Sequence, residues 1–204
     1  MMDFFTNYRA ETGNLLPLIY QSGYLTIKDY RQQRDTFLLD FPNNEVKDGL
    51  ISWLASDYWK LDTAKIGWKS RDLVLSMRQG DPETLRKLMT GFLAGIPYTM
   101  HWKEDERERE RYFHYTFYLI FNMVSIYTVY TEKEQSEGRV DCIVETDKYV
   151  YVFEFKLDGT AAEALAQIEA KGYARPYEAD ARKLFRIGAV FSSQTGTISD
   201  WAVV

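Results

Sequence analysis

The stretch "GRVDCIVETDKYVYVFEFKL", residues 138–157, decides how the rest of the chain is interpreted. It predicts two short strands, 139–145 and 149–157, joined by a tight "TDK" turn. The second strand is apolar on both faces until Glu154 and Lys156 appear near its end, so we expect a central strand that is covered on both sides. Charged side chains are seldom buried unless they are paired or bind something. An acid and a base in such a strand therefore need an explanation.

The preceding strand places a second acid near them. Asp141 shares a face with Arg139, and a hairpin would bring Asp141 close to Glu154 or Lys156 across the ladder. Two interpretations stay open. Glu154 and Lys156 can pair with each other or lie near a strand end in water. Alternatively, two carboxylates and an ammonium converge, and a hard divalent cation such as Mg²⁺ relieves the repulsion between the carboxylates. Such a metal can activate water for attack on a phosphodiester.

A charged run at 103–111 opens the helix that we expect before the first strand. Glu110 and His114 lie on one face of this helix, at the start of the stripe that faces the core. The segment 112–130 carries no formal charge and approaches the length of a membrane span. Its tyrosines and β-branched second half favour a buried helix that runs into a strand. We therefore expect no contact with a membrane.

The sequence after this helix predicts an α/β (α+β) domain. A strand near 124–131 precedes the hairpin, and the pattern Thr160-x-x-Glu163 marks the capping box of an alanine-rich helix after it. An apolar segment at 183–193 is expected to form a final core strand. The order of elements from about residue 104 is therefore α-β-β-β-α-β. The sequence has no Gly-x-x-x-x-Gly-Lys-Ser/Thr loop, so we expect no ATP hydrolysis by this chain alone.

Residues 1–100 are expected to form a small helical and β-hairpin subdomain ahead of a second domain at 101–204. Polar "RQQRD" (31–35) would join the two strands of the hairpin, and a helix follows "FPNN". Helix, hairpin and helix suggest a winged-helix-like or adaptor module, which could bind DNA. A packing subdomain without a binding role is an equally good interpretation.

Composition narrows the class of protein. The chain is 46% hydrophobic, so it can bury a real core. A single cysteine, Cys142, allows no internal disulfide framework, and no signal peptide is visible, so we expect a cytoplasmic protein. The net charge of −5 argues against a broad basic surface for nucleic acid. Any contact with nucleic acid should be local, or helped by a metal or a partner.

Asp141 followed by Glu154-Phe155-Lys156 resembles the signature of the PD-(D/E)XK nuclease superfamily. The predicted α-β-β-β-α-β order matches that family's core. The resemblance implies a restriction-endonuclease-like fold with a mixed central sheet. Residue 140 is Val where the family's name has a proline, a departure that many members share.

The resemblance implies a site for Mg²⁺, with Mn²⁺ as a substitute, held by Asp141, Glu154, the Phe155 carbonyl and Glu110. Lys156 would serve the attacking water or the transition state, and Gln167 would position water or phosphate. Arg139 would contact phosphate or pair with a carboxylate. Tyr173 would contact nucleic acid, although its spacing from Gln167 departs from the usual Q-x-x-x-Y. Independently of the resemblance, His114 is expected to be a buried, hydrogen-bonded histidine and not a ligand, although its position four residues after Glu110 places it near the site, behind the ligands.

Longer segments, among them "IYQSGYLTI" (19–27) and "FPNNEVKDGL" (41–50), look like the C-terminal half of uncharacterised bacterial AAA-ATPase-like proteins. In that family an ATPase-like domain precedes a linker subdomain and a PD-(D/E)XK domain. Two functions follow from the resemblance. One is a Mg²⁺-dependent nuclease that hydrolyses phosphodiester bonds, with DNA as the expected substrate. The other is a catalytically idle nuclease-fold module that binds or regulates an AAA-ATPase-like domain or partner protein.

Overall fold

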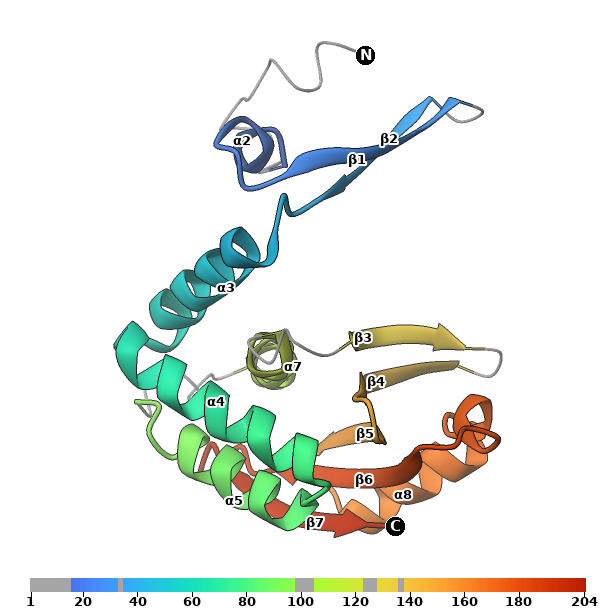
Figure 1. The fold of residues 1–204 in the computed structure, drawn as a ribbon. Coiled ribbons are helices and arrows are strands. Elements are labelled where there is room, and N and C mark those ends of the chain that lie inside the picture. Colours follow the sequence, from blue (N-terminus) through green and yellow to red (C-terminus); the bar gives the residue numbers. More distant parts are fainter. Residues whose placement is uncertain (1–15, 33–34, 98–104, 123–127, 136–137) are drawn as a thin grey trace. The chain divides into compact units, whose positions relative to one another are not determined.

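The computed structural model of the chain describes residues 16–32, 35–97, 105–122, 128–135 and 138–204 (Figure 1). The chain divides into two compact units, Met1–Trp53 and Leu54–Val204. The predicted domain boundary near residue 100 falls inside the second unit. Whether 1–100 and 101–204 act as separate domains stays a prediction.

The first unit contains the predicted short helix and hairpin. Helix α2 (Leu16–Gln21) precedes strand β1 (Thr26–Arg31), which pairs antiparallel with β2 (Thr36–Asp40). Helix α3 (Asn44–Trp59) begins after the "FPNN" break. Most residues of the two strands are exposed, and a hairpin alone is at best marginally stable in water. The winged-helix interpretation of this part of the chain stays a prediction.

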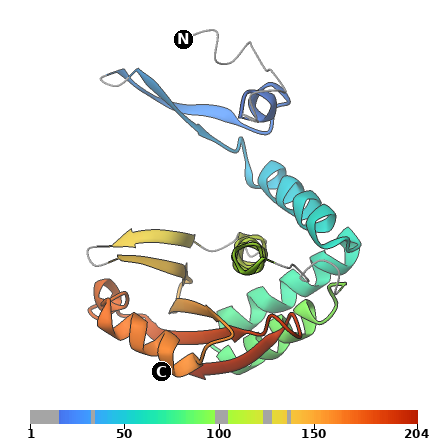
Figure 2. The ribbon, with the colours of Figure 1, turned by 180° about the vertical axis from the view of Figure 1, so that it is seen from behind.

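The second unit is built on one five-stranded sheet, in the order β3-β4-β5-β6-β7 (Figures 1 and 2). The strands are β3 (Thr128–Gln135), β4 (Gly138–Glu145), β5 (Tyr149–Leu157), β6 (Lys183–Phe191) and β7 (Ile198–Val203). Strands β5 and β6 are parallel and the other neighbours are antiparallel, so the sheet is mixed. This confirms the predicted fold class and places β5 at the centre of the sheet.

Two expectations about the strands need correction. The sequence predicts the first strand near 124–131, but β3 begins at Thr128 and ends at Gln135, while residues 123–127 lie outside the described part of the chain. The residues "EKEQ" (132–135) at the end of this strand are all polar, so the sequence favours a loop there. The pairing of β3 with β4 extends the strand through it. Strand β7 was not expected at all.

The helices of this unit are α4 (Thr63–Gln79), α5 (Pro82–Leu93), α7 (Glu106–Asn122) and α8 (Ala161–Ala170), with a 3₁₀ turn, η3, at Arg175–Tyr177. Helix α8 begins with the predicted capping box of Thr160 and Glu163. Among the described residues, no helix is long and apolar enough to cross a membrane.

The two faces of β5 pack in two separate cores. Tyr151 and Phe153 lie in a large aromatic core that includes side chains from α4, α5 and α7, and the Tyr151 hydroxyl donates to the Met77 carbonyl at 2.7 Å. Val150 and Val152 lie in a smaller core with Ile168 of α8. The central strand is thus covered on both sides, as its apolar sequence predicts. The α8 face is the one that carries Glu154 and Lys156.

Candidate active site

Asp141 and Glu154 meet where strands β4 and β5 separate. The backbone ladder between these strands ends at the pair Cys142–Phe153. Just beyond it, the Asp141 carboxylate accepts a hydrogen bond from the Phe155 backbone N–H at 2.8 Å. Where the ladder stops, the Asp141 side chain therefore replaces a backbone carbonyl as the acceptor for the Phe155 N–H. This contact holds Asp141 against the segment that carries Glu154 and Lys156.

Glu154 is the most unusual group in the site, because its side chain is buried with only 2% of its surface exposed. Its Oε1 lies 3.3 Å from the Lys156 ammonium, but its Oε2 is buried with no hydrogen-bond partner among the described residues. Burial raises the pKa of Glu154 to about 7, the Asp141 charge adds to the rise, and Lys156 and Gln167 oppose it. A buried carboxylate oxygen without a close partner is costly, so this oxygen is a candidate contact for a further ligand.

Lys156 lies between the acid and helix α8. Its Nζ donates to Gln167 Oε1 at 2.6 Å and to Glu154 Oε1 at 3.3 Å. An ammonium has three N–H donors, so these two contacts leave one for a water or a phosphate oxygen. The Gln167 carbonyl oxygen faces the lysine, and hydrogen bonds from Gln167 also lower the pKa of Glu154 and of Tyr173.

Tyr173 comes close to the same group of side chains. Only 2% of its surface is exposed, and its hydroxyl packs on the backbone at Gly138, where a β-carbon would lie 2.8 Å from the hydroxyl oxygen. Burial raises the pKa of Tyr173, with a further contribution from Glu154, and a hydrogen bond with Gln167 lowers it. The buried position favours a role inside the site over the predicted contact with nucleic acid. Arg139, by contrast, is exposed at the start of β4.

The side chains of Glu110 and His114 lie outside the described residues, although both positions fall within α7. Among the side chains that are described, no three His, Cys, Asp or Glu groups gather as a metal-binding cluster. The structure thus brings together four predicted residues: Asp141, Glu154, Lys156 and Gln167. Their catalytic and metal-binding roles stay predictions.

Strand β7 contributes a contact to this region that the sequence did not predict. The backbone N–H of Ala161, at the start of α8, donates to the Asp200 carboxylate at 2.9 Å. The available signal was the segment "ISDWAV", in which an apolar residue starts a short strand after the turn residues "TGT". Its polar positions weaken that signal.

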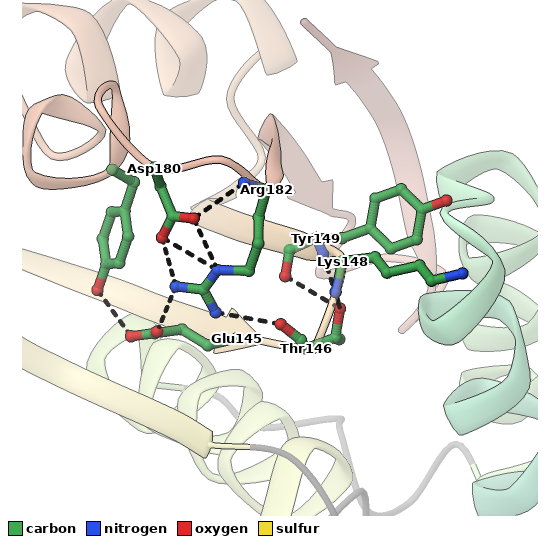
Figure 3. A network of polar contacts seen from close by, with 7 residues as sticks. Glu145, Thr146, Lys148, Tyr149, Asp180 and Arg182 are labelled. Carbon is green, nitrogen blue, oxygen red and sulfur yellow. Dashed lines mark hydrogen bonds and ion pairs between the residues drawn. The ribbon is translucent and has the colours of Figure 1, made fainter.

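A second polar cluster lies at the opposite end of the sheet, where β5 and β6 begin (Figure 3). The Arg182 guanidinium donates to Asp180 at 2.6 Å, to Glu145 at 2.9 Å and to the Thr146 carbonyl at 3.1 Å. The Tyr177 hydroxyl donates to the other oxygen of Glu145 at 3.1 Å. This cluster connects the β4–β5 turn to the segment that enters β6, and no sequence pattern predicts it.

Comparison with known proteins agrees with the geometry of this unit. Residues 108–201 match the family model of the PD-(D/E)XK nuclease superfamily. The matched segment spans β3 to β6, α8, most of α7 and the first part of β7, and its mixed α/β architecture is consistent with a restriction-endonuclease-like fold. It contains every residue that the sequence assigned to the site.

The chain is also similar to a longer protein. Over 190 residues it is 30% identical to an Azotobacter chroococcum mcd 1 protein described as "Uncharacterized protein in vnfD 5'region". The aligned region covers 91% of this chain but only 36% of that protein, so the chain spans about a third of the length of this curated relative. No solved structure matches the chain.

Proposed function

We propose that the chain carries a metal-dependent nuclease centre that hydrolyses phosphodiester bonds, with Mg²⁺ as the metal and DNA as the substrate. The main support is the Glu154 oxygen that is buried without a partner beside the Asp141 carboxylate. Two acids this close repel each other, and oxygen ligands of this kind suit a hard divalent cation. The match of residues 108–201 to a nuclease superfamily supports the same chemistry.

The residues present fit such a cation. Asp141 and Glu154 would hold it, with the Phe155 carbonyl, and Glu110 would join them from α7. When bound, Mg²⁺ supplies a water of lowered pKa and stabilises negative charge on the phosphodiester. Because Mg²⁺ keeps several waters when one or two carboxylates bind it, a site with few protein ligands is sufficient.

The remaining groups act on the water and the phosphate. The free N–H of Lys156 would donate to the attacking water or to a phosphate oxygen, stabilising the charge that develops in the transition state. Gln167 fixes the lysine through its carbonyl oxygen, at 2.6 Å. Its amide N–H groups would then orient the same water or phosphate.

DNA cleavage tests this proposal directly. Purified protein is incubated with plasmid and linear DNA in Mg²⁺ or Mn²⁺, and an Asp141→Ala/Lys156→Ala double variant serves as the inactive reference. We expect the wild type to cut and the double variant to leave the DNA intact. Equal DNA loss with both proteins would refute catalysis by this site on these substrates, and a parallel RNA substrate shows whether DNA is preferred.

A second function is a nuclease-fold module that binds or regulates without cutting, together with an AAA-ATPase-like domain or protein. The net charge of −5 favours it, because a nuclease that grips DNA through a broad surface is usually basic. Titration with Mn²⁺ tests whether the folded protein has a metal site. A metal that binds only the folded state raises the melting temperature, so a protein without that rise has no working metal site.

A further inference from the structure

Helix α8 lies close to the sheet at a glycine in β6. A β-carbon at Gly188 would overlap the Ala161 carbonyl oxygen and would lie 3.0 Å from the Ala164 side chain. Across the parallel ladder, Gly188 is the partner of Glu154. The missing side chain therefore lets the first turn of α8 cover the strand right beside the buried acid.

The start of α8 is also fixed from β7. The Ala161 N–H is one of the first four donors of the helix, which have no partner within it. It donates to the Asp200 carboxylate at 2.9 Å, and a negative charge at a helix N-terminus is favourable. The capping box of Thr160 and Glu163 satisfies other donors of this turn, and among the described residues its hydrogen bonds stay within the turn. Asp200 is the group that ties this turn to the sheet by a hydrogen bond.

The register of the sheet places this tie level with the lysine of the site. Asp200 pairs with Val190 across β7 and β6, and Val190 pairs with Lys156 across β6 and β5. All three side chains lie on the face that α8 covers. Asp200 thus contacts α8 in register with Lys156, which also forms a hydrogen bond with a residue of α8.

That partner is Gln167, six residues or about 1.7 turns after Ala161 on the same continuous helix. The Gln167–Lys156 contact is 2.6 Å long, and a hydrogen bond weakens beyond about 3.2 Å. A displacement of α8 of about 1 Å would therefore release the lysine. The anchor at Ala161 is about 9 Å along the helix from Gln167, so a shift or tilt at the anchor is carried to the contact.

We propose that Asp200 is a positioning residue of this site, which fixes the start of α8 and through it holds Gln167 on Lys156. Its effect on reaction rate rests on the proposed nuclease function, whereas its effect on Lys156 does not. Asp200 is exposed, so water can satisfy the Ala161 N–H when the carboxylate is removed. The loss should therefore disturb the site more than it disturbs global stability.

The test compares two helix-terminal aspartates in the full chain. Asp200→Ala removes the contact to α8, and Asp81→Ala removes a matched contact, from Thr84 N–H to Asp81 at 2.9 Å, at the start of α5. The readout is the ¹³Cε resonance of Lys156 in ¹³C-lysine-labelled protein, assigned by its loss in Lys156→Arg. We expect Asp200→Ala to shift this resonance toward its position in Gln167→Ala, and Asp81→Ala to leave it in place.

Asp200→Asn keeps a carbonyl oxygen that can accept the same hydrogen bond, so it should retain the wild-type resonance. Asp200→Ser, whose side chain is too short to span the distance, replaces Asp200→Ala should that variant not fold. A Lys156 resonance that stays at the wild-type position without the carboxylate would overturn the proposal. An equal shift in Asp81→Ala would do the same.

Cleavage kinetics give the second readout. In Asp200→Ala we expect kcat to fall about tenfold or more, since small misplacements at a reacting centre are costly, with KM changed by less than about twofold. In a Gln167→Ala background the same substitution should have no further effect, because both act through one contact. A wild type that cuts neither DNA nor RNA would remove the proposed function, and the Lys156 resonance would still decide whether Asp200 positions the lysine.

Discussion

The two ends of the central sheet carry similar charged side chains, but these side chains differ in how fully they are hydrogen-bonded. At the start of β5 and β6, Arg182 lies between Glu145 and Asp180, and near the end of β5, Lys156 lies beside Glu154 and close to Asp141. Each group contains two acids and one base. We call the first group the closed end of the sheet and the second the open end. They differ in how many of their carboxylate oxygens accept hydrogen bonds.

Hydrogen bonding explains that difference. At the closed end both oxygens of Glu145 have donors, and hydrogen bonds from Arg182 lower the pKa of Asp180 to about 2. At the open end one oxygen of Glu154 has no partner among the described residues and the pKa of Glu154 rises to about 7. A satisfied network rigidifies a fold, whereas an unsatisfied buried acid is the signature expected of a binding or catalytic centre. Charge composition alone does not separate the two.

The largest contrast is expected in activity. Glu154→Gln keeps the shape of the side chain but removes a proposed metal ligand, and a metal supplies several kcal/mol of transition-state stabilisation. We expect cleavage to fall by about 100-fold or more, together with loss of the rise in melting temperature with Mn²⁺. The matched change at the closed end, Glu145→Gln, should leave cleavage per folded molecule unchanged. Equal losses from both variants would erase the distinction between the two ends.

The second contrast is in the pH dependence of stability. The folded-state pKa of Glu154 is raised from 4.5 to about 7, so the native state binds more protons than the unfolded state in this range. Without metal, the free energy of unfolding should therefore fall as pH rises from about 4.5 to about 7, by up to about 3 kcal/mol. Chemical denaturation at several pH values measures this, and Glu154→Gln should remove the decline.

The closed end should respond in the opposite direction. The pKa of Asp180 is lowered from 3.8 to about 2, so its contribution is present above pH 3.8 and is lost as pH falls toward 2. Arg182→Met would leave both acids without their main donor and should cost about 2 kcal/mol of stability at neutral pH, with no effect on the Mn²⁺ response. A stability that does not change in this variant would show that the closed end is not a structural clamp.

The smallest contrast compares two buried tyrosines. Tyr177 donates to Glu145 at the closed end, and Tyr173 lies beside Gln167 and Glu154 at the open end. Tyr177→Phe should cost about 1 kcal/mol of stability and leave the pH profile of cleavage unchanged. Tyr173→Phe should change that pH profile, because it removes a group that interacts with the site. Indistinguishable profiles would place Tyr173 among the structural residues.

Much of the open end could be predicted because its residues are close in sequence. The alternation along 149–157 fixes which side chains share a face, and the short turn before it forces the hairpin that brings Asp141 to Glu154. The capping box of Thr160 and Glu163 is likewise a local pattern, and it is confirmed. The closed end could not be predicted, because Arg182 meets Glu145 across 37 positions of the chain and no local pattern encodes that pairing.

The sequence by itself determined the central strand, its two faces and the acids and base at its end, because a period of two and a tight turn act over a few residues. Only the tertiary structure decided that Glu154 is buried with an unpaired oxygen, that Tyr173 is inside the site, and that Asp200 anchors α8. These features depend on how helices pack on the sheet, and at Gly188 the missing side chain permits the close approach of α8. Burial and hydrogen-bond satisfaction belong to the packed molecule, and here they separate a candidate active centre from a structural clamp.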